Sequence, residues 1–132
     1  EKIITSPLLR ARETSTIISE ILNIPIFFSD NLTEWSGVNN WIGKTIEEIK
    51  NSKEYSKEKS SLDLSPVDET LKSVYERVKI EYKNNTNTLF VSHQDTIRAF
   101  TYFLTNDENY SMCRPKNCEI QFIENNIIHT LS

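Results

Sequence analysis

The feature that most constrains the fold is a junction, found twice, at which a short apolar strand leads directly into a helix. Lys2–Thr5 is apolar and β-branched, as a buried strand is, and Ser6-Pro7 after it is typical of a helix N-cap and first helical position. Thr88–Ser92 predicts another such strand, and His93 separates it from a helix expected over about Gln94 to Leu104. Strands alternating with helices predict an α/β fold, here a three-layer α/β/α arrangement with a mostly parallel sheet.

Apolar spacing and turn residues indicate the other elements. The first helix is expected to end at about Leu22, with Ala11, Ile18 and Ile21 in its apolar stripe, and Ile24–Phe28 is expected as the next strand. The remaining expectations, in chain order, are a loop over 29–43, a short helix over Thr45–Ile49, a solvated and mobile segment over 51–61, a helix from Ser65 to about Lys83, a loop over 105–116, and a hairpin of Glu119–Ile123 with Ile127–Leu131.

Composition restricts the kinds of partner. The chain of 132 residues is expected to form a single domain with one core, and its net charge of −4 with interspersed signs argues against nucleic-acid binding. A basic pocket for a small phosphorylated substrate is still compatible with that charge. No apolar run reaches about 18 residues, so no membrane span is predicted. Two cysteines, Cys113 and Cys118, are too few for a disulfide framework, and free thiols predict a cytoplasmic protein.

The same cysteines allow a second interpretation, a metal site completed by His129. The chain offers only these three thiol and imidazole ligands together, with four residues between the cysteines. Structural zinc takes four ligands, usually in closer pairs. The sequence therefore predicts no metal, and nothing in it calls for another cofactor.

The first helix start carries two cations, Arg10 and Arg12, within Ser6–Thr14. A helix N-terminus is partially positive, so each cation there costs roughly 0.3–1 kcal/mol unless an anion binds. Backbone N–H groups and a guanidinium would converge on one phosphate. The alternative is a pair of solvated arginines on a surface helix.

The second helix start carries His93, placed where the strand over Thr88–Ser92 ends. Ligands of open α/β sheets bind outside the carboxyl ends of the strands. A histidine there can act as acid, base or nucleophile, or bind phosphate when cationic. The alternative is a helix-capping or core histidine. For Arg98, one turn further on, a structural salt bridge is the favoured role.

A third candidate is Glu34, in a loop between Leu32 and Gly37 and next to Trp35. A carboxyl group that is partly buried beside an aromatic ring has a raised pKa, which suits a general acid. An exposed loop glutamate without such a role is the commoner case.

Taken together, these stretches resemble the histidine phosphatase (phosphoglycerate mutase-like) superfamily. The family shows Ser-Pro-Leu-x-Arg-Ala-x-x-Thr, here Ser6–Thr14, and then Leu-x-Glu followed by glycines and a tryptophan, here Leu32–Glu34 with Trp41 and Gly43. It continues with a Gly-Glu-Ser-like helix start and a later arginine, and it closes with Ser-His-Gly-Gly-x-Ile-Arg. These last two stretches are represented here by Asp68-Glu69-Thr70 with Arg77, and by Ser92 to Arg98.

The resemblance implies phosphoryl transfer on a small phosphate monoester, with roles for individual residues. Arg10 would clamp the phosphate, His93 would stabilise the transferring phosphoryl group with Gln94 beside it, and Glu34 would protonate the leaving oxygen. No metal is implied. Gln94 and Asp95 stand where the family has two glycines, which is expected to narrow the pocket and to place a carboxylate near the anion.

The resemblance also implies a residue that this sequence does not contain. The family's nucleophile is a histidine in an Arg-His-Gly motif on a first strand, expected upstream of Glu1, and the chain starts without Met. His129, in the expected hairpin, is a poor substitute. The domain is therefore expected to be N-terminally incomplete and inactive by itself, with a homodimer formed through exposed strand edges. The alternative function is a non-catalytic phosphate-binding or scaffold protein.

Overall fold

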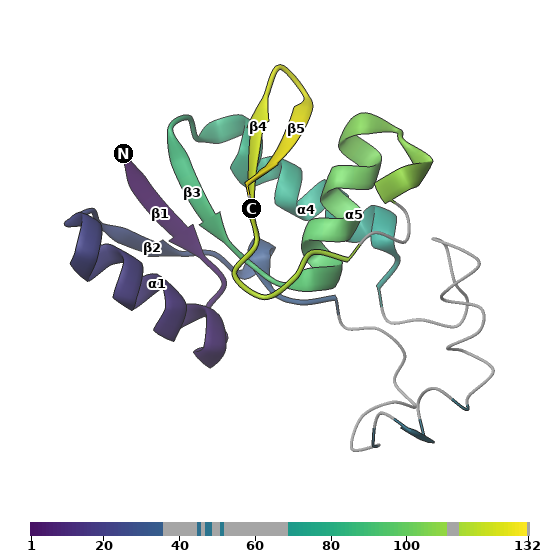
Figure 1. Ribbon diagram of the computed structural model, residues 1–132, viewed down its shortest axis with the longest axis horizontal. Coiled ribbons are helices and arrows are strands. Elements are labelled where there is room, and N and C mark those ends of the chain that lie inside the picture. Colours follow the sequence, from purple (N-terminus) through teal and green to yellow (C-terminus); the bar gives the residue numbers. More distant parts are fainter. Residues whose placement is uncertain (36–44, 46, 49–50, 52–68, 111–113, 132) are drawn as a thin grey trace.

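The computed structural model describes residues 1–35, 45, 47, 48, 51, 69–110 and 114–131 of the chain. The helices and strands are distributed along the whole described chain (Figure 1). In chain order they are β1 Lys2–Thr5, α1 Leu9–Leu22, β2 Ile26–Phe28, the 3-10 helix Asp30–Leu32, α4 Leu71–Asn84, β3 Thr88–Val91, α5 Gln94–Thr105, the 3-10 helix Glu108–Tyr110, β4 Ile120–Glu124 and β5 Ile127–Leu131.

The central sheet is parallel and has the strand order β2-β1-β3, so the predicted α/β fold with a parallel sheet is confirmed. In register, Ile4 of β1 lies opposite Phe27 of β2 on one side and Phe90 of β3 on the other. β1, the first strand of the chain, is therefore the middle strand of this sheet. Because both neighbours run parallel to it, all three strands end at the same edge.

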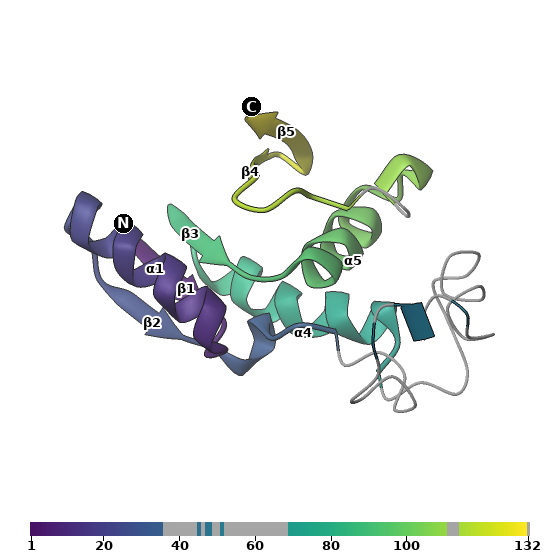
Figure 2. The same cartoon turned by 60° about the horizontal axis from the view of Figure 1, so that its bottom comes forward.

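The two faces of the sheet are covered by different helices. Ile4 belongs to the core cluster with Val74 and Val78 of α4, whereas the next residue, Thr5, directs its Oγ1 to the carbonyl of Ala11 in α1 at 3.4 Å. Side chains alternate along a strand, so α1 covers one face and α4 the other. Figure 2 shows α1 running along this sheet, with the hairpin set apart from it.

The core lies between the sheet and the pair α4 and α5. Tyr75 of α4 stacks against Phe100 at 5.8 Å and contacts Phe103 at 5.6 Å, and Tyr82 meets Phe100 edge-on at 5.1 Å. Aromatic pairs of this kind contribute about 0.5–1.5 kcal/mol each beyond their buried area. Side chains from separate parts of the chain complete this core: Ile4, Leu32, Trp35, Leu71, Val74, Val78, Ala99 and Phe100.

The strands β4 and β5 form a separate antiparallel sheet, so the predicted hairpin is confirmed. Its turn residues Asn125 and Asn126 both have positive φ, 53° and 60°, the conformation that a tight hairpin turn needs and that asparagine tolerates. On one face, Ile123 packs against the core. On the other face, Phe122 lies opposite His129, and the neighbouring Ile120, Ile127 and Leu131 are exposed as well.

The structure corrects the expected helix starts. α1 begins at Leu9 with Leu8 as its N-cap, not at Ser6-Pro7, and Leu8 provides no side-chain hydrogen bond. α4 begins at Leu71 and not at Ser65, because Thr70 is extended and its side chain accepts from the N–H of Ser73. The strand expected over Ile24–Phe28 is shorter and begins at Ile26.

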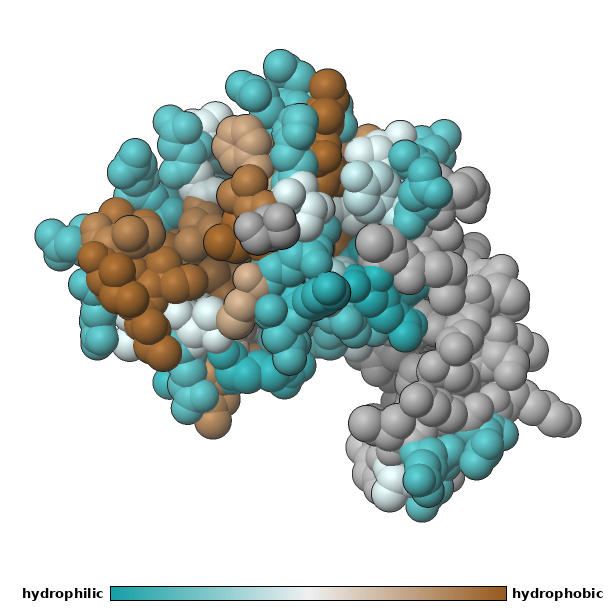
Figure 3. Space-filling view, in the orientation of Figure 1, coloured by the Kyte–Doolittle hydropathy of each residue, from teal (hydrophilic) through white to brown (hydrophobic). Residues whose placement is uncertain are grey.

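The apolar stripe predicted for α1 is only partly buried. Ala11 is 4% exposed, whereas Ile21 is 75% and Leu22 is 58% exposed. Figure 3 shows hydrophobic side chains at the surface over α1. Both of these exposed residues, Ile21 and Leu22, lie in the last turn of the helix.

Several expectations concern residues outside the described part of the chain. These are Trp41, Gly43, Asp68 and Cys113, most of the short helix over Thr45–Ile49, the segment over 51–61 apart from Asn51, and the helix start at Ser65-Pro66. Within the described residues, no helix is long and apolar enough to cross a membrane. The described residues also contain no group of three or more His, Cys, Asp or Glu side chains suited to a metal ion.

Candidate active site

Two polar side chains meet at the edge where the parallel strands end. Ser6 directly follows β1, and His93 follows β3 after one residue. The N–H of Ser6 donates to the carbonyl of Val91 at 2.9 Å, which extends the pairing of the two strands by one step. The sheet geometry therefore holds these two positions, which lie far apart in sequence, side by side.

A direct hydrogen bond joins Ser6 and His93. The distance between Ser6 Oγ and His93 Nε2 is 2.8 Å, and the two residues are 0% and 6% exposed. Ser6 Oγ also accepts from the N–H of Leu8 at 3.3 Å. Ser6 is thus not the helix N-cap that its sequence context predicted, because its hydroxyl is turned toward the histidine of the neighbouring strand.

Burial and two cations keep His93 uncharged. Desolvation lowers the pKa of His93 to about 4, and the positive charges of Arg10 on α1 and Arg77 on α4 act in the same direction. The ring is therefore neutral at neutral pH and acts as a hydrogen-bonding group instead of a cation. Both positive charges oppose protonation of the ring.

The two arginines differ in exposure and in their partners. Arg10 is exposed on the first turn of α1, as is Arg12 on the same turn. Arg77 is fixed by an ion pair of 2.7 Å to Glu69, and its Nη1 donates to the carbonyl of Asn31 at 2.6 Å. The arginine that was expected to clamp an anion is thus the one with its side chain in solvent.

Glu34 lies at the N-terminal end of α5, the helix that His93 caps. Its Oε1 accepts from the backbone N–H of Trp35 at 2.9 Å, and from the N–H and the hydroxyl of Thr96 at 3.1 Å each. Burial is the main cause of its raised pKa, with a smaller contribution from the charge of Asp95, and the three hydrogen bonds act in the opposite direction. The raised pKa that the sequence predicted is present in the structure, but it is moderated by these donors.

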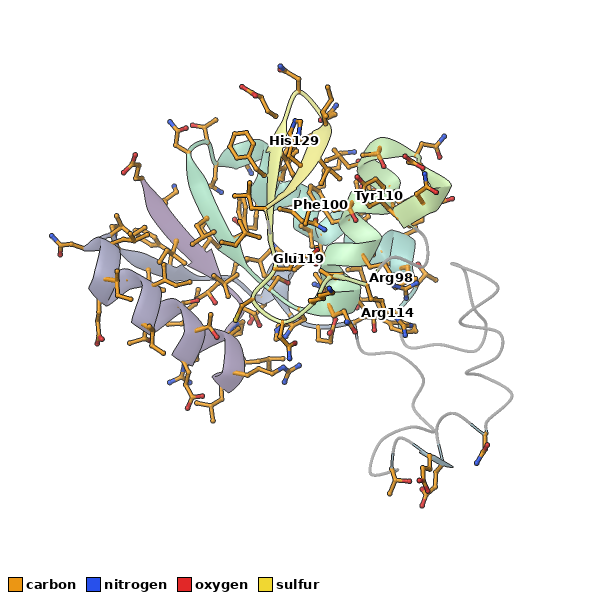
Figure 4. The ribbon with its side chains drawn as sticks, viewed as in Figure 1. Arg98, Phe100, Tyr110, Arg114, Glu119 and His129 are labelled. Carbon is orange, nitrogen blue, oxygen red and sulfur yellow. The ribbon has the colours of Figure 1, made fainter. Side chains whose placement is uncertain are left out.

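Gln94 and Asp95 are both occupied by neighbouring groups. The amide nitrogen of Gln94 donates to the carbonyl of Pro115 at 2.9 Å. Asp95 Oδ1 lies 3.0 Å from Nε of Arg98 and 3.2 Å from Nε of Arg114. Figure 4 shows Arg98 and Arg114 next to each other at α5. The charge of the aspartate is therefore compensated locally, which reduces the repulsion of an anion expected from the sequence.

The structure gathers four of the predicted features at one edge of the sheet, namely Arg10, His93, Gln94 and Glu34. His129 is not among them, because it lies on β5 in the separate hairpin (Figure 4). Arg98 takes the salt-bridge role favoured by the sequence. It is fully buried, and its Nε lies 3.0 Å from Asp95.

Sequence reasoning missed two contributors to the site. Thr96 binds Glu34, and no pattern in the sequence singled it out. Arg114 lies in a segment expected to be a simple loop. Both are revealed only by the contacts that the first turn of α5 makes with loops distant in sequence, Thr96 with Glu34 and Asp95 with Arg114.

The fold has relatives among solved structures. The native mycobacterial glucosyl-3-phosphoglycerate phosphatase is 17% identical, with a TM-score of 0.78 over 91% of this chain and 66% of that chain. The alpha-ribazole phosphatase from Shigella flexneri is 19% identical, with a TM-score of 0.66 over 98% and 71%. YhfR of Bacillus stearothermophilus is 20% identical, with a TM-score of 0.68 over 98% and 71%.

At these identities the likeness shows the fold alone. The chain spans 67% and 60% of the lengths of two further structures, mycobacterial hydrolases 1 and 2. A comparison with curated protein sequences gives no significant match. The family itself is shown by sequence, because residues 1–126 match the histidine phosphatase superfamily (branch 1). This chain therefore belongs to that superfamily, whose general chemistry is phosphoryl transfer.

Proposed function

We propose that this protein acts in phosphoryl transfer, as a phosphatase or mutase, on a small phosphate monoester through a phosphohistidine. The observation that carries the proposal is the position of His93 as N-cap of α5, 2.8 Å from Ser6 where β1 and β3 end, with Arg10 on the first turn of α1 just after Ser6. Cationic and N–H donor groups that converge on one point favour a transferring phosphoryl group. The similar phosphatases of mycobacteria and Shigella flexneri are named for organic phosphate substrates, which supports the substrate class.

Each residue has a distinct proposed role. The exposed guanidinium of Arg10 binds two phosphate oxygens, and the ring of His93 donates to a third. Gln94 contributes through its main-chain N–H, since its side-chain nitrogen is already bonded to Pro115. Glu34 protonates the leaving oxygen, and its raised pKa extends the pH range in which it still holds a proton.

The nucleophile is proposed to be a histidine outside this sequence. The chain contains two histidines, His93 in the site and His129 in the hairpin. The carboxylate of Glu34 accepts three hydrogen bonds, and His93 is bonded to Ser6, so neither resembles a free attacking group. The 132-residue chain is therefore expected not to turn over substrate by itself.

Two measurements test this function. The first is hydrolysis of p-nitrophenyl phosphate between pH 5 and 7 by the chain and by His93→Ala, with no turnover expected from either protein. Joining an upstream segment that carries an Arg-His-Gly strand is expected to produce activity that His93→Ala then removes. Activity of the chain alone that disappears in His93→Ala would contradict the proposed external nucleophile.

The second measurement is binding of inorganic phosphate, followed by calorimetry. Arg10→Ala is expected to weaken binding about tenfold to a hundredfold, because a charge-assisted hydrogen bond is lost. Arg12→Ala is the matched control, since this arginine is exposed on the same turn, and it is expected to change the affinity less than about twofold. Equal effects of both substitutions would mean that only general charge attracts the anion.

A second candidate function is a non-catalytic phosphate-binding or scaffold protein. The observation in its favour is the single histidine at the site within the 132 residues. Both candidates predict phosphate binding, so calorimetry does not separate them. Turnover after addition of the Arg-His-Gly strand supports the enzyme, and continued inactivity supports the binding protein.

We also propose that two copies of this chain associate. β3 and β4 each pair with only one strand within the described residues, and the outer face of the hairpin exposes Ile120 and Phe122. Open strand edges and exposed apolar faces both favour strand addition from another chain.

Cys118 is a free, exposed thiol, which supports the proposal of a cytoplasmic protein.

A further inference from the structure

The hydrogen bond between Ser6 and His93 determines which nitrogen of the ring carries the proton. A buried hydroxyl must place its single proton on an acceptor. Ser6 is 0% exposed, and its Oγ already accepts the N–H of Leu8 at 3.3 Å. His93 Nε2, at 2.8 Å, is the only other hydrogen-bond partner of this oxygen among the described residues. The arrangement that satisfies all three groups has Ser6 donating to an unprotonated Nε2.

The histidine side of this pair leads to the same assignment. The surroundings of His93 favour its neutral form, in which only one ring nitrogen holds a proton. If Nε2 accepts from Ser6, that proton lies on Nδ1. Within the described part of the chain the ring has no other hydrogen bond. Nδ1–H is therefore an available donor on a residue that lies just past the end of β3.

We infer that Ser6 is a positioning residue, which fixes His93 in the Nδ1–H form and so directs an N–H donor to an oxygen of the transferring phosphoryl group. This inference rests on the proposed function, since it names how His93 would meet that group. The charged groups that act on the ring are Arg10 from α1 and Arg77 from α4. Among the described residues neither guanidinium donates a hydrogen bond to the ring, so the role of Ser6 as donor to Nε2 is not duplicated by them.

The direct test is the tautomer of His93 in the 132-residue chain, read from long-range ¹H–¹⁵N NMR spectra at pH 7. The chain has only two histidines, so a His129→Gln variant assigns both signals. The expected result is the Nδ1–H pattern for His93. An Nε2–H or doubly protonated ring would overturn the inference, whatever any variant does.

Substitution of Ser6 gives the second readout. In Ser6→Ala we expect the ring to shift toward the Nε2–H form and the affinity for inorganic phosphate to fall about threefold to tenfold, as for one lost hydrogen bond. Ser15→Ala is the matched control, because Ser15 is equally buried but donates only to the carbonyl of Ala11, at 2.8 Å. It should leave both the tautomer and the affinity unchanged.

The outcomes separate this inference from the proposed function. A wild-type chain with the Nδ1–H ring but no phosphate binding would support the hydrogen bond and contradict the phosphate site. Phosphate binding with the opposite tautomer would contradict only the role of Ser6. If Ser6→Ala does not fold, Ser6→Cys replaces the hydroxyl by a weaker donor of similar shape, and a wild-type-like tautomer with unchanged affinity in that variant would count against the inference.

Discussion

The edge of the parallel sheet and the outer face of the hairpin show opposite relations between polarity and burial. At the sheet edge the polar side chains Ser6, His93 and Arg98 are 0%, 6% and 0% exposed. On the hairpin the apolar side chains Phe122 and Leu131 are 52% and 56% exposed. Burial of polar groups costs free energy unless each finds a partner, and exposed apolar groups forgo the gain of burial.

The difference bears on the roles proposed for the two regions, chemistry at the sheet edge and association at the hairpin. Each of these three buried polar groups has a partner within hydrogen-bond distance, such as Ser6 for His93 and Asp95 for Arg98. The outer face of the hairpin instead exposes the large apolar side chains Ile120, Phe122, Ile127 and Leu131. The first pattern is typical of functional sites, and the second of surfaces that another chain covers.

The largest expected effect comes from removing the buried cation at the sheet edge. Arg98→Ala is expected to lower the free energy of unfolding by about 3–5 kcal/mol, because it breaks a buried ion pair and leaves a cavity. Urea denaturation measures this change. Lys79→Ala, in a partly exposed ion pair with Glu76 at 3.9 Å, is the control and should change the free energy of unfolding by less than about 1 kcal/mol. Equal changes in the free energy of unfolding for Arg98→Ala and Lys79→Ala would mean that the buried polar groups at the sheet edge stabilise the fold no more than a surface ion pair does.

The next effect concerns the pH dependence of stability. The pKa of His93 is about 4 in the folded chain and 6.5 as a reference, so between these values the unfolded chain binds the proton more readily. The free energy of unfolding should therefore be constant above about pH 6.5 and fall by up to about 3 kcal/mol as the pH drops to 4. Denaturation of the wild type and of His93→Gln across this range measures this fall in the free energy of unfolding. The fall should be absent in the variant.

Glu34 changes the free energy of unfolding with pH in the opposite direction to His93, and this sharpens that experiment. Burial raises its pKa above 4.5, so the folded chain takes up this proton first as the pH falls. Its contribution therefore increases stability as the pH drops through the folded pKa toward 4.5. In a His93→Gln background the pH dependence of unfolding should reverse in sign, and an added Glu34→Gln should remove it. A steep loss of stability that survives in the double variant would mean that other groups dominate.

The smallest expected effect on stability comes from the hairpin. Phe122→Ser should change the free energy of unfolding of the monomer by less than about 0.5–1 kcal/mol, because the ring is half exposed. It should instead weaken self-association at least about tenfold, since an apolar anchor is removed from the interface. Analytical ultracentrifugation over a range of concentrations measures this. Ile80→Ser, similarly exposed at 53% but on α4, is the control, and a wild type that stays monomeric would contradict the dimer.

Much of the architecture was predictable because local signals agreed with it. β-branched runs bounded by turn residues predicted β1, β3 and the hairpin, and apolar spacing predicted a helix over most of the length of α4. Helix starts were less predictable, because Ser-Pro pairs signal a cap whether or not the chain uses them. Thr70, not Ser65, is the N-cap of α4. The exposed end of α1 was also missed, since an apolar stripe does not say which of its residues the rest of the fold covers.

The sequence by itself determined the alternation of strands and helices, and with it the positions of Arg10, His93 and Glu34 at element ends. Only the tertiary structure decided what those residues touch. It paired β1 with β3, turned Ser6 from an expected cap into the partner of His93, and bound Glu34 to Thr96. Local patterns report propensity along the chain. Hydrogen bonds and charges act between atoms that the fold alone brings within a few ångströms, as at the 2.8 Å contact between residues 6 and 93.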